Sequence, residues 1–211
     1  MRACMLLAVG VLASSANAAI YTDNTFDMFD NGFDNLDIAS VDMSDDGVNL
    51  TIAVTTRGFQ NWTKYMMYFD TAAGGTTSNA WSRPVDLNGR EIEHYIGSWV
   101  DAPSDNAQFW SWGESWNQTG TLTNSVSGNT VTWTMSLASL GLNAGDTFYF
   151  DIATSGGGND PGVDHLSRSD AATPGWGTAS VAGGFASYTT LPTPGAIALL
   201  GLAGLAGRRR R

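Results

Sequence analysis

The sequence predicts an all-β fold, a single antiparallel β-sandwich such as a jelly roll, set between a hydrophobic N-terminal segment and a hydrophobic C-terminal helix. Short segments in which apolar and polar residues alternate recur along the chain, and this is the period of a half-buried strand. Turns rich in glycine, asparagine and aspartate separate these segments, and the central region shows no long helical period. This combination is typical of sandwiches built from about seven or eight short strands.

The first two predicted strands form a hairpin, because residues 36–43 alternate, residues 44–47 favour a turn and residues 48–55 alternate again. Further strands are expected at 63–70, 92–99, 121–127, 130–136, 147–154 and 185–190, and one helical turn at 136–142 that ends at Gly141 or at the bend 143–145. The alternation predicts a core made of Ile38, Leu50, Ile52, Val54, Met67, Phe69, Val131, Trp133, Phe148, Phe150 and Ile152. The loops 71–90 and 155–184 are too long for plain hairpins, and loops of this length are usually functional or mobile.

The N-terminus predicts a secretory signal peptide over residues 1–19. A short basic start precedes an apolar run at 5–12, and Ala16-Asn17-Ala18 is a small-residue cleavage site. The single cysteine, Cys4, is expected to leave with this peptide. The exported body, residues 20–190, then has no disulfide, no thiol nucleophile and no thiolate metal ligand.

The predicted body is strongly acidic. All twenty acidic residues fall within it, whereas only five of the ten basic residues do, namely Arg57, Lys64, Arg83, Arg90 and Arg168. Such a surface repels nucleic acid and anionic lipid, so we expect no nucleic-acid partner.

Aspartates crowd into residues 23–37 at the start of the body. Asp23, Asp27, Asp30 and Asp34 are hard oxygen ligands at a spacing that can wrap Ca²⁺, which takes about six to eight of them. The alternative is a solvated acidic segment, because the spacing matches no EF-hand. A second, weaker candidate in the long loop consists of Asn159, Asp160 and Asp164.

Tryptophans gather in the segment 99–116, and Trp81 lies on the loop that precedes it. Indole rings stack on the C–H faces of sugars, so Trp81, Trp112 and Trp116, with Tyr95 on the intervening strand, are the candidate glycan-binding residues. The alternative is that these rings fill the core.

Residues with catalytic potential are sparse. Glu91 and Glu93 share a strand face and Glu114 lies near the tryptophans, which could supply a two-carboxylate glycosidase site, but carboxylates two residues apart on a strand more often form a solvated outer face. The two histidines, His94 and His165, have no nucleophile motif beside them, and His94 is expected to be half-buried structure. We therefore expect a protein that is not an enzyme.

The C-terminal residues 191–211 resemble the PEP-CTERM sorting signals of Gram-negative bacteria. Pro192-Thr193-Pro194 stands where that family usually has Pro-Glu-Pro, an apolar helix is expected at 196–207, and four arginines, 208–211, end the chain. The resemblance implies transient anchoring in the inner membrane, processing by an exosortase-type enzyme, and delivery to the cell surface or extracellular matrix. The alternative is a C-terminal anchor that is never cut.

The body resembles the DOMON-like sandwiches, a group that includes family 9 carbohydrate-binding modules. The resemblance covers residues 33–154 and is carried by the segments 34–38, 46–52, 68–71 with Gly74-Gly75, and 136–148. Its motifs are strand and turn patterns, and none of the family's sugar-stacking aromatics or haem ligands is carried over to a numbered position here. Together these features predict an exported, non-catalytic β-sandwich that binds carbohydrate of the extracellular polysaccharide. The alternatives are a purely structural matrix protein and, less favoured, a glycoside hydrolase.

Overall fold

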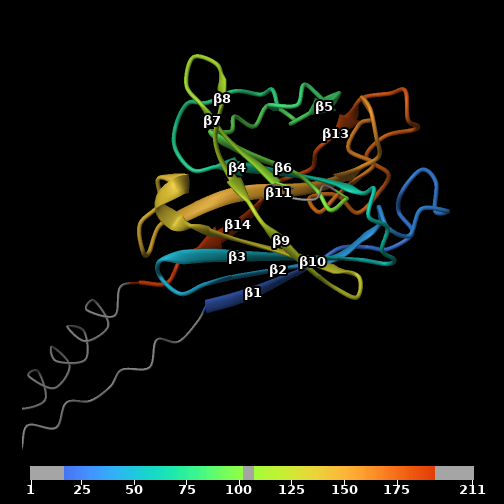
Figure 1. Ribbon diagram of the computed structural model, residues 1–211. Helices are drawn as coiled ribbons and strands as arrows, with labels where there is room; N and C mark the ends of the chain where they lie inside the picture. Colours follow the sequence, from blue (N-terminus) through green and yellow to red (C-terminus); the bar gives the residue numbers. More distant parts are fainter. Residues whose placement is uncertain (1–16, 102–106, 193–211) are drawn as a thin grey trace, which may run out of the picture.

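Two antiparallel β-sheets pack face to face in the computed structural model, which describes residues 17–101 and 107–192 (Figure 1). The predicted all-β fold is thereby confirmed. The expected apolar helix at 196–207, the arginine run 208–211, Thr193 and Pro194 lie outside the described residues, as does most of the predicted signal peptide. Within the described ranges, no helix combines the length and the apolar character needed to cross a membrane.

One sheet has five strands in the order β1-β2-β3-β10-β9. Its strands are β1 (Asn17–Thr22), β2 (Ile38–Asp45), β3 (Asn49–Thr56), β9 (Asn124–Ser127) and β10 (Thr130–Ser136). The predicted hairpin is confirmed, because β2 and β3 pair from Asp45↔Leu50 onward and Gly47 adopts the positive φ of 83° that the turn requires. The predicted turn at 128–129 is confirmed in the same way, since Gly128 has a φ of 58°.

The other sheet has seven strands along the path β12-β11-β4-β6-β7-β8, with β14 also paired to β11. Its strands are β4 (Lys64–Asp70), β6 (His94–Trp99), β7 (Ala107–Trp112), β8 (Trp116–Leu122), β11 (Thr147–Ser155), β12 (Asp164–His165) and β14 (Ala186–Thr189). The one predicted helical turn is the 3₁₀ helix η1 (Leu137–Leu140), which Gly141 ends in the left-handed conformation. A separate parallel pair joins β5 (Val85–Asp86) to β13 (Ser180–Val181).

Every residue predicted to face the core is buried between the two sheets. Trp133 on β10 is 1% exposed, and its indole N–H donates to Ser98 Oγ at 2.9 Å. Alternation therefore located the interior correctly, because inward positions on each strand recur every second residue.

The structure contains strands that the sequence did not predict, namely β7 in the tryptophan-rich segment and the short strands β5, β12 and β13 in the long loops, and it differs from the prediction at two further places. The expected strand 121–127 is divided between β8 of one sheet and β9 of the other, so the chain passes between the sheets near Thr123. Strand β1 begins at Asn17 and so includes the last three residues of the predicted signal peptide. If cleavage follows Ala18, the pairs from Ala19↔Met43 to Thr22↔Ser40 still hold β1 to β2.

The two long loops cover the second face of the seven-stranded sheet. Val85 and Leu87 from one loop and Ala182 from the other share a buried cluster with the sheet, together with Ile92 and Phe185, which lie just after the two loops. The sheet contributes Met66, Tyr68, Tyr95 and Ala153 to this cluster. The parallel pair β5–β13 links the loops, which lie toward the top of Figure 1. The loops therefore form a third layer over the sheet.

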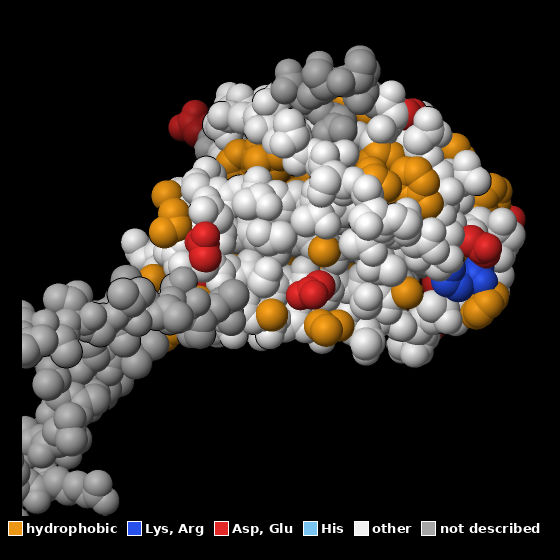
Figure 2. Space-filling view, turned by 60° about the horizontal axis from the view of Figure 1, so that its bottom comes forward, with side chains coloured by type: hydrophobic (Ala, Val, Ile, Leu, Met, Phe, Trp, Pro, Cys, Tyr) orange, Lys and Arg blue, Asp and Glu red, His pale blue; other side chains and the backbone are white. Residues whose placement is uncertain are grey.

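The outer face of the five-stranded sheet is rich in hydroxyl groups. Thr55 pairs with Thr130, and Thr51 with Thr134, through Oγ–Oγ contacts of 2.8 and 3.2 Å. Figure 2 brings forward the bottom of Figure 1, where β1, β2 and β3 lie, and its surface is mainly uncharged, with acidic and apolar side chains scattered over it. Among the described residues of this view, the apolar side chains are scattered in small groups.

We expect Trp133→Ala to lower the free energy of unfolding by about 3–5 kcal/mol, because truncating a buried tryptophan leaves a cavity. Val126→Ala on edge strand β9 is the control: Val126 is 44% exposed, so we expect a change within about 0.5 kcal/mol. Urea unfolding measures both values, and equal effects would contradict the assigned core.

Candidate functional site

Five aromatic rings touch in sequence across the second face of the seven-stranded sheet, and we call them the aromatic strip. They are Trp99, Trp81, Tyr95, Trp116 and Trp112. Successive ring centroids lie 5.6, 5.8, 6.2 and 5.5 Å apart. The strip brings together all four residues that the sequence nominated for glycan binding, since Trp81, Tyr95, Trp112 and Trp116 belong to it.

Local features of two strands position the indoles of the strip. Gly97 on β6 leaves room for Trp81, because a Cβ added there would overlap the indole ring. The side-chain oxygen of Gln108 accepts the indole N–H of Trp81 at 2.7 Å and that of Trp110 at 3.3 Å. A glycine inside a strand often marks such a close approach, so Gly97 was a usable sequence signal.

The rings of the strip differ in their access to solvent. Trp81, Trp112 and Trp116 are half-buried, whereas Tyr95 is fully buried and contacts both Trp81 and Trp116 from below the surface. Neighbouring rings meet at angles between 41° and 70°, so they do not form one flat platform. Tyr95 therefore supports the exposed rings and does not itself touch a surface ligand.

A shallow hollow of about 250 Å³ lies at one end of the strip, lined by Lys64, Trp81, Arg83, Trp99 and Gly158. Lys64 donates to the carboxylate of Asp101 at 3.2 Å. The buried Arg83 guanidinium donates to Ser155 Oγ and to backbone carbonyls of the loop that contains Gly158. The indoles of Trp81 and Trp99 thus form the apolar sides of the hollow, and its charged groups, Lys64 and Arg83, already have hydrogen-bond partners.

A second candidate site consists of four aspartates, Asp23, Asp27, Asp37 and Asp164, which we call the acidic cluster. Asp27, Asp37 and Asp164 each offer one ligand oxygen within 4.8 Å of the others. Asp23 is not one of these three, but burial and the negative charges of Asp164 and Asp27 together raise the pKa of its carboxyl group, so we include it in the cluster. The cluster combines members of both groups of candidate ligands that the sequence contained, since Asp27 comes from the first group and Asp164 from the second.

Several carboxylate oxygens of the acidic cluster are buried without a hydrogen-bond donor. They are Oδ2 of Asp23, both oxygens of Asp27 and Oδ1 of Asp37. Asp37 is fully buried, and its Oδ2 lies 2.7 Å from Nε of Arg57. Asp164 is better satisfied, because it accepts backbone N–H groups of Ile38 and His165.

Burial and mutual repulsion disfavour ionisation of these groups in the metal-free protein. Burial, reinforced by the charges of Asp164 and Asp27, raises the pKa of Asp23 from 3.8 to about 9. Burial likewise raises the pKa of Asp164 to about 8. The pKa of Asp27 is also raised, chiefly by burial.

Two of the four aspartates predicted as metal ligands lie outside the acidic cluster. Asp30 is exposed, and its Oδ1 accepts the backbone N–H of Gly32. Asp34 is also exposed and forms an ion pair with Arg57. Asp23 and Asp27, in contrast, lie within the cluster.

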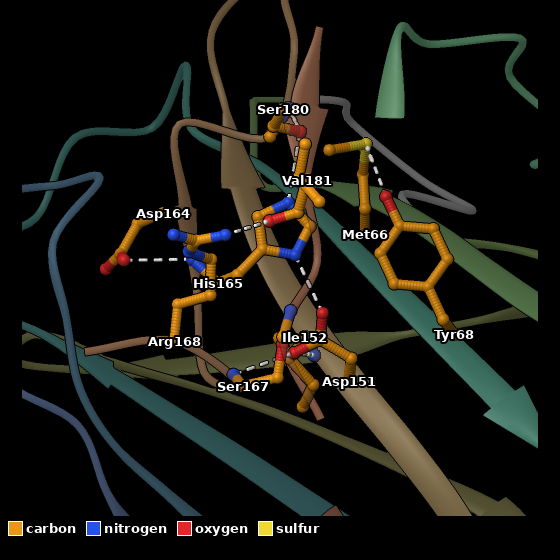
Figure 3. Close-up of polar contacts among 12 residues, drawn as sticks. Met66, Tyr68, Asp151, Ile152, Asp164, His165, Ser167, Arg168, Ser180 and Val181 are labelled. Atoms are coloured by element: carbon orange, nitrogen blue, oxygen red, sulfur yellow. Dashed lines mark hydrogen bonds and ion pairs between the residues drawn. The ribbon is translucent and has the colours of Figure 1, made fainter. Parts of the chain in front are cut away.

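A buried hydrogen-bonded series, Asp151–His165–Ser180, lies near the acidic cluster (Figure 3). Asp151 Oδ2 is 2.7 Å from His165 Nδ1, and His165 Nε2 is 3.2 Å from Ser180 Oγ. This order of groups is that of a hydrolytic triad. However, all three residues are buried, and Ser180 Oγ also accepts the backbone N–H of Gly162, at which an added Cβ would overlap the imidazole. No substrate carbonyl can reach Oγ in this conformation.

The remaining catalytic candidates do not converge. Glu93 accepts the backbone N–H groups of Thr71 and Ala72, which is a structural role, and Glu91 and Glu114 are exposed. His94 is half-buried, as predicted, and burial lowers its pKa.

No protein-family model and no curated protein matches this chain. The family resemblances therefore rest on the sequence segments that carry them. The features that sequence reasoning missed, the Asp151–His165–Ser180 series and the meeting of Asp164 with the N-terminal aspartates, depend on the path of the long loops.

In the presence of a chelator, we expect the melting temperature to fall as the pH rises from 5 to 9. A carboxyl group whose folded pKa is raised contributes stability that is complete below its unfolded pKa and is lost as the pH rises through the folded pKa. For Asp23 and Asp164 that window runs from 3.8 to about 8–9. Asp23→Asn should flatten this dependence in thermal scans, and an unchanged slope would contradict the assignment.

Proposed function

We propose that this protein is an exported, non-catalytic β-sandwich that binds carbohydrate of an extracellular polysaccharide through the aromatic strip. The observation that carries the proposal is the run of contacting aromatic rings that ends at a hollow with two indole walls. Aromatic faces of this kind pack against the apolar C–H faces of sugar rings. The indole N–H of Trp112 has no hydrogen-bond partner among the described residues, so it is free to donate to a sugar hydroxyl.

Two further observations agree with a binding role. The long loops, which supply Trp81 and the glycine of the hollow, are fixed over the sheet by the β5–β13 pair, so the binding surface is preformed. The buried position of Ser180 gives the one triad-like group among the described residues no access to substrate. Both features favour recognition over chemistry.

The finer identifications belong to the same proposal. They are a DOMON-like sandwich related to family 9 carbohydrate-binding modules, a PEP-CTERM sorting signal at 191–211 and an exosortase-type processing partner. The inferred location is the cell surface or extracellular matrix, reached through an inner-membrane intermediate.

A purely structural matrix protein is the second candidate function. It is favoured by the angles between the rings of the strip. Rings that meet at 41–70° pack against one another, as in a hydrophobic cluster, whereas a sugar-stacking platform would need coplanar rings. The two functions differ in what happens when an exposed ring is removed.

We expect Trp112→Ala and Trp116→Ala each to weaken retention on the native polysaccharide several-fold, since stacking contributes about 0.5–1.5 kcal/mol per ring. Both indoles are half-buried near the β7–β8 turn, so the melting temperature should change little. Affinity electrophoresis measures retention. Trp62→Ala, which removes another half-buried indole outside the strip, is the matched control and should bind normally. Variants that unfold, or that bind as tightly as the wild type, would favour the structural function.

Sorting is tested at the tail. Replacing Arg208 to Arg211 with serine should let the apolar segment pass through the membrane and release uncut protein, because arginines resist translocation. Replacing Pro192 and Pro194 with alanine should retain an anchored precursor. Immunoblots of membrane and medium fractions distinguish these results, and release of both variants at the wild-type size and rate would exclude the sorting signal.

A further inference from the structure

The acidic cluster lacks the positive charge that its geometry requires. Arg57 is the only basic side chain that forms an ion pair with the cluster among the described residues, and it contacts only Asp37 within it. The unpaired oxygens of Asp23, Asp27 and Asp37 are shielded from solvent and receive no protein donor. Native proteins pair buried carboxylates or use them to coordinate metals, because an isolated buried charge is costly.

The ligand chemistry of the cluster selects a hard cation. All four side chains offer oxygen, and the nearby imidazole of His165 already has Asp151 and Ser180 at its two nitrogens. Asp27, Asp37 and Asp164 bring three carboxylates within 4.8 Å of one another. Several protein carboxylates around one ion suit Ca²⁺, because Mg²⁺ usually keeps several waters and is bound through only one or two carboxylates.

We propose that Asp27, Asp37 and Asp164 bind one Ca²⁺ ion, with Asp23 as a neighbouring negative charge. Asp27 and Asp37 lie between the end of β1 and the start of β2, and Asp164 begins β12. The ion would therefore fasten the N-terminal loop, residues 23–37, to the far end of the seven-stranded sheet.

Hydrogen bonds already hold the end of the N-terminal loop against β11 and β12, where the ion would bind. The backbone N–H of Ile38 donates to Asp164 Oδ2 at 2.6 Å, and the hydroxyl of Thr154 donates to the carbonyl of Leu36. The loop contains no strand of its own, and its apolar contacts form a small separate cluster around Met28, Leu36 and Val163. In a body without cysteine, the ion provides the cross-link that a disulfide would otherwise supply.

The test is Ca²⁺ titration of the purified, chelator-treated protein, followed by calorimetry and by thermal unfolding. We expect one ion per chain and a melting temperature that rises by several degrees with millimolar Ca²⁺, because a ligand specific to the folded state stabilises it. Equimolar Mg²⁺ should give a clearly smaller shift. No shift with Ca²⁺, or an equal shift with Mg²⁺, would overturn the proposal.

Asp27→Asn is the decisive variant, because it removes one charge without changing the shape of the side chain. Because the variant removes repulsion between neighbouring carboxylates, it should be at least as stable as the wild type when both are measured in chelator. Its Kd for Ca²⁺ should rise at least about tenfold. Asp30→Asn, on the same loop but outside the cluster, is the matched control and should titrate like the wild type. If Asp27→Asn keeps the wild-type response, or if Asp30→Asn loses it, the ion does not bind at the cluster. Glycan retention plays no part in this readout, so its outcome is independent of the proposed carbohydrate binding.

Discussion

Burial of the central strands of the seven-stranded sheet on both faces is the constraint on which the other features depend. Five successive residues of β4 and the last six of β11 are buried, so neither face of these strands can meet water. One face packs on the five-stranded sheet, and the long loops must cover the other. Because loops carry backbone and side-chain polar groups into the interior, each such group needs a partner there.

Most of the buried polar groups have found partners. Arg83 donates to Ser155 and to loop carbonyls, and His165 lies between Asp151 and Ser180 while its ring is parallel to that of Tyr68. Among the described residues, the acidic cluster concentrates the exceptions: four of its carboxylate oxygens are buried without a donor, whereas Tyr65, Tyr95 and Glu93 each have one unpaired side-chain oxygen elsewhere. Four unpaired acceptors at one place support the proposed cation more strongly than a crowded acidic sequence does.

The sequence could predict the sandwich because alternation is a local signal that one buried face imposes on each strand. It could not predict the third layer, since the path of the long loops depends on contacts such as Ser180↔Val85 between residues far apart in the chain. The same limit applies to the sites. Asp23 and Asp27 were identifiable from their crowding, but their meeting with Asp164 depends on β12 pairing with β11 beside the start of β2. The tryptophans were identifiable by type, whereas the burial of Tyr95 beneath them follows from the loop that carries Trp81.

The connection between β11 and β12, residues 156–163, relates the two proposed sites. Gly158 lines the hollow beside Trp81, and Arg83 holds the carbonyls of Gly157 and Asp160. Directly after this connection, Asp164 contributes to the acidic cluster. An ion bound there would fix the C-terminal end of this connection, while Gly158 near its N-terminal end lines the hollow. The connection would then lose less conformational entropy when a glycan binds. Since Lys64 and Arg83 are already engaged, the hollow would then select its ligand by ring stacking and shape, which suits a neutral sugar better than an anionic one.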